Sequence, residues 1–484
     1  MYGNAHALNP NDADCLYNWG RILYILLDFL PSHTSPTKRL NALSNSIQKF
    51  RGALALNPQN ADVLFNLAQA LATQAELLQD TDEGNEQAAM ALQEAVVIFE
   101  SVYKAQEKEL KEQEELNRQA EAQEMGMEKG EGGGGGGGDK MEIDGVASVD
   151  QSPPNSRTDS ATDSNAILGE ETTVTEILPI TPYTLIDTLI STASALTSLA
   201  FLVDSLPSAT DLYASAISKL ELAQQLLPTP TSSGDMTTLA DNDAKLCEIE
   251  LAHASTLSSL ADRTLQETGC VDHAAYTSGL AKLDAVLARA PRNVEALCDR
   301  GDLLSSYAQA VAQSPVPTPD DPSASEEDSP AKQAWQLLLA ATQSFTAAKH
   351  CEPRNTGILL KLGDMNLARA RLPLLVAARN RAQLLRNAEF FYRQAVELNR
   401  EDLEGGWVCL AQAVWLQGKG EEAVEGKMGE ANKVVKGWRR RGGDADMLRR
   451  VGAENEVIEG EFIEWAVGVL LEGEEAEEEK EEKM

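Results

Sequence analysis

Apolar residues recur at helical spacing in short segments, and the segments break at the same kind of site. The segment from Ala5 to Tyr24 reads AHALNPNDADCLYNWGRILY, and the segment from Ala53 to Ala72 reads ALALNPQNADVLFNLAQALA. In both, one helical pattern ends at Asn-Pro and another begins a few residues later, because proline cannot continue a helix. The pattern predicts helix-turn-helix units repeated along the chain.

The predicted helices are of two alternating types. A first helix carries large apolar residues around a small one, as in Leu16-x2-Trp19-Gly20-x2-Leu23. A second helix carries a small residue and an aromatic, as in Ser46-x3-Phe50, and ends at a proline. We expect the small residue of the first helix to permit close packing, and the aromatic to fill the gap between successive pairs.

This pattern resembles that of tetratricopeptide repeat (TPR) proteins, and it recurs over most of the chain. Later first helices are expected at Leu185 to Val203, Leu246 to Ala261, and around Leu297, Leu359 and Trp407. The resemblance implies an all-α fold, an α-solenoid of about six TPR-type helix-turn-helix pairs. It differs from the family in its long inserts between helices and in a disordered linker in the middle of the chain.

Composition divides the chain into parts. Residues 1–124 hold N-terminal repeats that end in a charged helix, and residues 125–175 form a Gly-rich, acidic and Ser-rich linker predicted to be disordered. Residues 176–471 hold C-terminal repeats with a Pro- and Ser-rich disordered insert at 314–330. Residues 472–484 are an acidic tail, also predicted to be disordered.

The first repeat is predicted to be truncated. Tyr2, Ala5 and Pro10 take the places of the aromatic, the small residue and the proline of a second helix. Met1 then falls within a second helix that lacks its first helix, and a misplaced start codon would explain this. The alternative is that a half-repeat simply frays.

Two further helices are predicted. From Tyr103 to Gln123 the chain alternates Glu and Lys at helical spacing without apolar heptads, which favours a solvated helix projecting from the stack over a coiled coil. From Glu461 to Leu471 an amphipathic helix is expected to cap the last repeat.

The formal net charge is −35 and the pI is about 4.5. Such a charge makes nucleic acid and anionic lipid unlikely partners and suits a strongly basic protein, although an acidic surface also serves solubility alone. The most apolar stretch, Thr188 to Val203, has only 16 residues, which favours a buried helix over membrane insertion. With no signal peptide, the sequence predicts a cytoplasmic or nuclear location.

The sequence offers no catalytic or metal-binding motif. The six cysteines form no CxxC pair, and the five histidines are scattered. We therefore expect no enzyme activity, no cofactor, no metal and no small-molecule substrate.

The TPR resemblance implies a concave groove, lined by first helices, that binds a partner polypeptide. Asp302 and Asp364 follow glycines inside two first helices, where a capping role does not explain them. Asp62 and Glu295 lie at helix starts, where capping or dipole stabilisation is the alternative. The predicted partner-binding residues are Asp302, Asp364, Glu295, Asn18, Asn66 and Asp62.

Three functions fit these observations. The first is a scaffold or adaptor, in a sharper form an assembly chaperone for a basic client such as a ribosomal protein. The second is a co-chaperone of heat-shock proteins, because Asn18 and Asn66 loosely match the asparagines of a known TPR carboxylate clamp, although its basic residues are missing. The third is an RNA-associated factor that uses the Arg-rich C-terminal repeats, where arginines lying along a helix surface are the alternative.

Overall fold

The computed structural model describes residues 2–30, 34–79, 84–128, 179–228, 236–313, 329–400, 405–419, 423–454 and 457–482. Within these ranges the chain is all-α, as predicted. The N-terminal half contains α1 (Tyr2–Leu8), α2 (Ala13–Ile25), the 3-10 helix η1 (Leu26–Phe29), α3 (Pro36–Leu56), α4 (Ala61–Gln79), α5 (Asn85–Glu128), α6 (Pro182–Leu202), α7 (Leu206–Gln225) and α8 (Met236–Thr268). The C-terminal half contains α9 (His273–Arg289), α10 (Val294–Gln313), α11 (Pro330–Cys351), α12 (Thr356–Arg371), α13 (Leu375–Leu398), α14 (Gly406–Gln417), α15 (Lys427–Arg439), α16 (Ala445–Glu454) and α17 (Gly460–Glu482).

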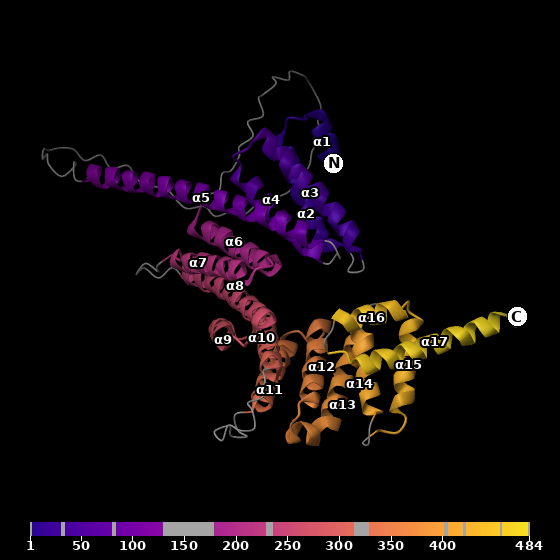
Figure 1. Cartoon of the computed structure of the whole chain (residues 1–484). Helices are drawn as coiled ribbons and strands as arrows, with labels where there is room; N and C mark the ends of the chain where they lie inside the picture. Colours follow the sequence, from indigo (N-terminus) through magenta and orange to yellow (C-terminus); the bar gives the residue numbers. More distant parts are fainter. Residues whose placement is uncertain are drawn as a thin grey trace, which may run out of the picture.

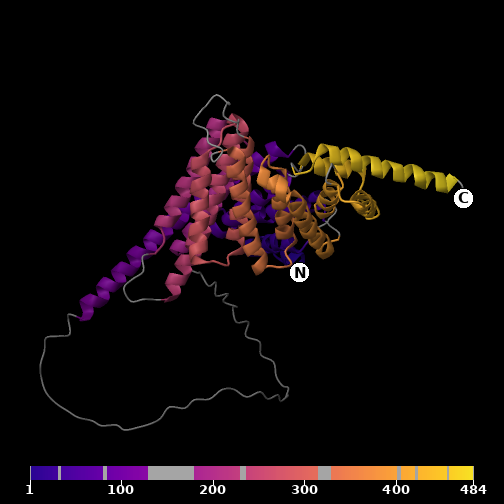
Figure 2. The same cartoon turned by 90° about the horizontal axis from the view of Figure 1, so that it is seen from below.

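The helices pack as consecutive pairs that stack into an α-solenoid (Figures 1 and 2). Within the described ranges there are seven pairs, from α2 with α3 to α14 with α15, against about six expected. The first helices of neighbouring pairs touch each other directly: α2 with α4, α4 with α6, α6 with α8, and α8 with α10. Outside its own pair, each second helix from α3 to α13 contacts the first helix of the next pair. The first helices therefore line the inner side of the bend seen in Figure 1.

A Pro-x-Asn/Asp turn starts many of the first helices. Asn60 lies two residues after Pro58, and its side-chain oxygen accepts a hydrogen bond from the Val63 N–H at 3.1 Å. The same cap is formed by Asp12, Asn293 and Asn355, at 2.9, 2.9 and 3.2 Å. Each cap satisfies a backbone donor that the first turn leaves free. Asp62 therefore lies just inside α4 and does not cap it.

Small residues face aromatic rings inside three of the described pairs. A Cβ added at Gly20, Gly301 or Gly363 would lie closer than 3 Å to a ring of the second helix of the same pair. The rings are those of Phe50, Phe345 and Tyr392, respectively, and all three are fully buried. The expectation that the aromatics fill the gap between pairs is corrected, because these rings set the closest approach within a pair.

Helix α5 projects far beyond its pair, as predicted (Figure 1). Its exposed part carries ion pairs at helical spacing, such as Lys111 with Glu107 at 2.9 Å. The helix continues to Glu128, so it passes residue 124, where we expected the linker to begin. The remainder of the predicted linker and the insert as far as residue 328 lie outside the described residues.

The C-terminal helix covers the last pair. Phe462 and Ala466 of α17 are fully buried in the same apolar core as α14 and α15. The predicted disorder of the acidic tail is wrong for residues 472–482, which continue α17. A helix already nucleated by packed turns propagates readily into Glu, Ala and Lys, which have high helix propensity.

In the described part of the chain, α6 alone is long and apolar enough to cross a bilayer by length and composition. It is packed against α5, α7 and α8, with Leu189 and Ala193 buried. The buried Thr188 hydroxyl donates to the Gln106 side chain of α5 at 2.8 Å. These contacts are those of a core helix, as the sequence predicted.

Candidate partner-binding face

Polar contacts join neighbouring first helices along the inner side of the solenoid. Asn66 of α4 donates to the Tyr17 hydroxyl of α2 at 3.2 Å. Farther along the chain, Lys245 of α8 pairs with Asp187 of α6 at 2.7 Å, and Lys361 of α12 pairs with Asp302 of α10 at 2.5 Å. Polar contacts therefore join α2 to α4, α6 to α8 and α10 to α12 on the inner side.

Three acidic residues form a row on α10. Glu295, Asp299 and Asp302 are separated by four and three residues, so they share one face of the helix. Burial, together with the negative charges of Glu295 and Asp302, raises the pKa of Asp299 to about 6. We call Glu295, Asp299 and Asp302 the α10 acidic row.

Lys361 is the cation paired with this row. Its ammonium contacts the Asp302 carboxylate, and both side chains are nearly half exposed, at 48% and 45%. An ion pair this exposed contributes little to stability, on the order of 0–1 kcal/mol. Asp302 is therefore accessible to another cation at low cost.

Asp364 behaves differently from Asp302. Its carboxylate accepts a hydrogen bond from the Tyr392 hydroxyl of α13 at 2.7 Å, and burial raises its pKa. The same arrangement joins Asp262 of α8 to the Tyr276 hydroxyl of α9 at 2.7 Å. Asp364 thus has a partner inside its own helix pair, in addition to its electrostatic interaction with Asp302.

The predicted residues of the N-terminal repeats form a separate group. Asn18 and Asn66 donate to backbone oxygens one turn earlier in their own helices, at 2.9 and 2.8 Å. Asp62 is exposed, and its charge adds to burial in raising the pKa of Tyr17, to which Asn66 also donates. The structure thus gathers these residues at α2 and α4, and Glu295, Asp302 and Asp364 at α10 and α12.

Two members of the α10–α12 group were missed from the sequence. Asp299 lies one helical turn after Glu295, so helical spacing carried the signal for it. Lys361 lies on another helix beyond an insert, and the sequence pattern does not give the register between the two helices. The acidic row is thus partly predictable, whereas its counter-ion is not.

Most of the C-terminal arginines are engaged within the molecule. Arg371 donates to the Val457 carbonyl at 2.6 Å and pairs with Glu459 at 3.0 Å. Arg369 lies over the Trp335 ring, and Arg393 pairs with acidic residues of two helices. These contacts fit the alternative of arginines lying along helix surfaces.

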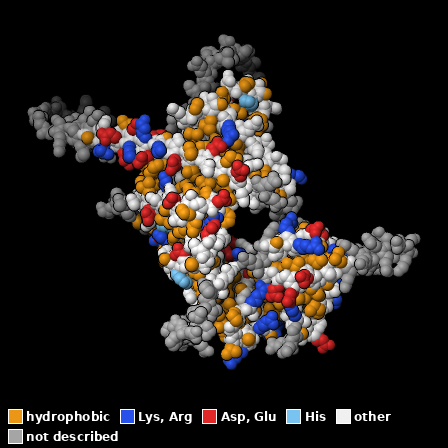
Figure 3. Space-filling model, viewed as in Figure 1, with side chains coloured by type: hydrophobic (Ala, Val, Ile, Leu, Met, Phe, Trp, Pro, Cys, Tyr) orange, Lys and Arg blue, Asp and Glu red, His pale blue; other side chains and the backbone are white. Residues whose placement is uncertain are grey.

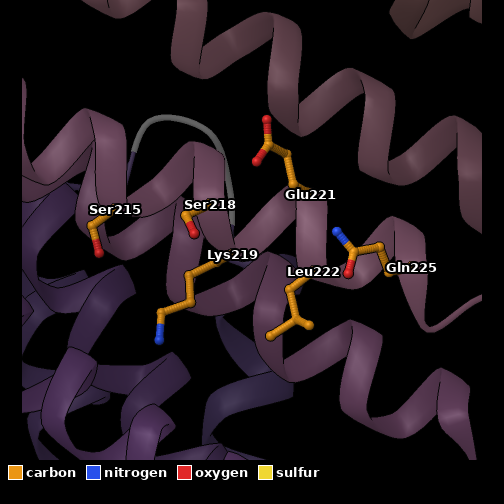
Figure 4. A pocket seen from close by; sticks show the side chains of 6 residues that line it. All are labelled: Ser215, Ser218, Lys219, Glu221, Leu222 and Gln225. Carbon is orange, nitrogen blue, oxygen red and sulfur yellow. The ribbon is translucent and has the colours of Figure 1, made fainter.

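An open hollow of about 430 Å³ lies beside α7 (Figure 4). The lining residues come from this helix alone: Ser215, Ser218, Lys219, Glu221, Leu222 and Gln225. Lys219 pairs with Glu100 of α5 at 3.2 Å. Because α7 is a second helix, the hollow is not part of the inner face. Among the described residues no group of three or more His, Cys, Asp or Glu side chains is placed to hold a metal.

Parts of the chain are similar to a known protein family and to a curated protein. Residues 3–168, about a third of the chain, match a family described as plant specific mitochondrial import receptor subunit TOM20. A curated relative, UPF0656 protein C926.02 of Schizosaccharomyces pombe, is 31% identical over 105 residues. That match covers 22% of this chain and 23% of the relative, so the chain spans about a quarter of the relative's length.

Solved structures with helical repeats were also found. A circular tandem repeat protein is 14% identical, with a TM-score of 0.30 and coverage of 95% of both chains. Yeast Tom70 is 11% identical, with a TM-score of 0.22 and coverage of 98% of this chain and 95% of Tom70.

The family match corrects one prediction. The cytoplasmic or nuclear location is contradicted, because the family matched by residues 3–168 is named as a mitochondrial import receptor subunit. The prediction rested on the lack of a signal peptide, and that absence does not by itself determine a compartment.

Proposed function

We propose that this protein is a non-enzymatic TPR-type scaffold that binds a basic polypeptide on its inner face. The observation that carries the proposal is the α10 acidic row, with three carboxylates on one face of a first helix. In a chain of net charge −35, such a row attracts Lys- and Arg-rich segments from a distance.

The TPR assignment is part of this proposal. Its support is the recurring Pro-x-Asn/Asp cap and the contact between a small residue and an aromatic within the pairs α2–α3, α10–α11 and α12–α13. The family matched by residues 3–168 is named as a receptor subunit, which favours binding over catalysis. In a sharper form, the protein is an assembly chaperone that shields a basic client, such as a ribosomal protein, until the client reaches its destination.

The test is a binding titration with a fluorescent Lys/Arg-rich peptide as the probe. We expect Glu295→Lys/Asp302→Lys to weaken binding by about tenfold or more, because it replaces two carboxylates with like charges. Wild-type binding should also fall steeply between about 50 and 300 mM salt, as the Debye length shortens.

The control carries the same charge change elsewhere. Glu86→Lys/Asp211→Lys alters exposed residues of the second helices α5 and α7. If this variant weakens binding as much as the first, the attraction comes from overall charge and the proposed face is wrong.

The structure favours neither alternative function. The clamp asparagines Asn18 and Asn66 already donate to their own helices, and Tyr17 and Phe65 occupy places where a clamp would need cations. Arg369, Arg371 and Arg393, three of the arginines on which the RNA hypothesis relied, are engaged inside the molecule, and the net charge of −35 opposes binding of a phosphate backbone by the others.

A further inference from the structure

One helix surface is basic in this acidic protein. Residues 375–388, the first part of α13, contain Arg379, Arg381 and Arg386 and no Asp or Glu. Arg379 and Arg386 are exposed and lie two helical turns apart, on one side of the helix. We call Arg379, Arg381 and Arg386 the α13 basic face. In Figure 3, Lys and Arg side chains gather over the lower part of the molecule, where α12 to α16 lie.

The α13 basic face is not neutralised by the rest of the described chain. None of its three arginines forms an ion pair with a described residue, and Arg386 donates only to Gln383 of its own helix, at 2.8 Å. Arg393, two turns further along α13, is by contrast paired with Glu389 and Glu430. The arginines at the start of α13 are therefore available to an acidic partner.

The C-terminal part of the chain carries an acidic segment that complements the α13 basic face in charge. Residues 472–482 contain eight Glu and a single Lys, and they continue the helix α17. Leu470 of α17 is buried, and from there the helix runs outward from the body of the molecule (Figures 1 and 2). Because the helix is continuous, its acidic end is directed away from α13 of the same chain.

We propose that the acidic end of α17 docks on the α13 basic face of a second copy of this chain. The acidic end is long enough to cover the basic face, because residues 472–482 span about 16 Å and Arg379 to Arg386 about 10 Å. Arginine binds carboxylates through two parallel N–H bonds, which gives such a contact direction as well as charge. A reciprocal arrangement closes a two-fold dimer.

The experiment measures molar mass by light scattering on the full chain. The monomer mass is 52.2 kDa. We expect a concentration-dependent rise toward twice this mass at about 50 mM salt, and its loss at about 300 mM salt, because exposed charges are screened.

Two variants separate the donor surface from the acceptor surface. Arg379→Glu/Arg386→Glu keeps the acidic helix end and loses the basic face, and deletion of residues 472–484 does the opposite. Each alone should be monomeric, with association weakened by about tenfold or more. An equal mixture of the two retains one of the two reciprocal contacts, so it should form a complex of one copy of each at higher concentration than the wild type needs. The control Arg292→Glu/Arg354→Glu changes two exposed arginines away from α13 and should associate like the wild type.

Three results would overturn the proposal. The first is a wild-type chain that stays at the monomer mass at low salt. The second is a mixture of the two variants that forms no complex, and the third is an Arg292→Glu/Arg354→Glu control that loses association as fully as the α13 variant. Circular dichroism of each variant shows that the fold is retained.

Discussion

Two neighbouring helix pairs are built alike and use an aspartate differently. In α10 with α11, Gly301 faces Phe345 and is followed by Asp302; in α12 with α13, Gly363 faces Tyr392 and is followed by Asp364. Tyr392 offers a hydroxyl, and Asp364 accepts from it. Phe345 offers none, and Asp302 pairs with Lys361 on the inner face. A single phenol oxygen thus distinguishes a structural aspartate from one available to a partner.

The close approach of the two helices is common to both pairs, and its loss should have the largest effect. Gly363→Ala places a Cβ against the buried Tyr392 ring, and we expect a loss of about 2–3 kcal/mol, because a packed core resists added volume. Urea unfolding monitored by circular dichroism measures this.

The control is Gly429→Ala in α15, where nothing lies within 4 Å of the added Cβ. This variant should be neutral or gain about 0.5–1 kcal/mol from helix propensity. Equal losses at both positions would show that helix packing does not distinguish them.

Removing the Tyr392 hydroxyl tests whether this group makes Asp364 a structural residue. Tyr392→Phe leaves the half-buried Asp364 carboxylate without its donor, and we expect a loss of about 1–2 kcal/mol in unfolding free energy. The same change at Tyr276 should have a similar cost, because Tyr276 donates to Asp262.

Tyr213 serves as the control, because its hydroxyl does not donate to an aspartate as those of Tyr392 and Tyr276 do. Its buried hydroxyl has no hydrogen-bond partner in the described structure. In α6 the residue after Ala200 is Phe201, whereas in α8 the residue after Ala261 is Asp262, the acceptor for Tyr276. Tyr213→Phe should therefore cost less than Tyr392→Phe or even stabilise the protein. A larger loss at Tyr213 would contradict our interpretation of the two Tyr–Asp contacts.

The acidic row on α10 should make stability depend on pH. The pKa of Asp299 is raised to about 6 in the folded chain, above that of an unfolded aspartate near 3.9. Between these values the folded state binds more protons, so stability falls as pH rises from about 4 to about 6.

Asp299→Asn removes this titration. Above pH 6 we expect a gain of up to about 1 kcal/mol, reduced from the full linkage value because solvent and salt screen the row. Below about pH 4 the variant and the wild type should have equal stability. A wild-type pH profile that the substitution leaves unchanged would contradict the raised pKa.

The repeating parts of this fold follow from local sequence, and the specific contacts do not. The Pro-x-Asn cap of α4 and the close approach of the two helices at Gly20 depend on residues near in sequence or on a fixed motif, so they were predictable. The ring that meets Gly20 was not, because Phe50 was expected between pairs. The pairing of Lys361 with Asp302 depends on the register of two helices separated by an insert. The helical end of α17 was missed because its acidic composition, read alone, indicates disorder, whereas the packed turns before it nucleate the helix.

The smallest effect on stability belongs to the exposed ion pair between Lys361 of α12 and Asp302 of α10. Lys361→Met breaks the pair with Asp302, and because both side chains are nearly half exposed, the unfolding free energy should change by no more than about 0.5 kcal/mol. Binding should respond in the opposite sense. Without its internal cation, the α10 acidic row presents one more uncompensated charge, so a Lys/Arg-rich peptide should bind a few-fold more tightly at low salt. Tyr392→Phe should leave that affinity almost unchanged, because Asp364 lies within its own pair. If Lys361→Met weakens peptide binding, Lys361 itself contacts the peptide and Asp302 is not the residue that attracts it.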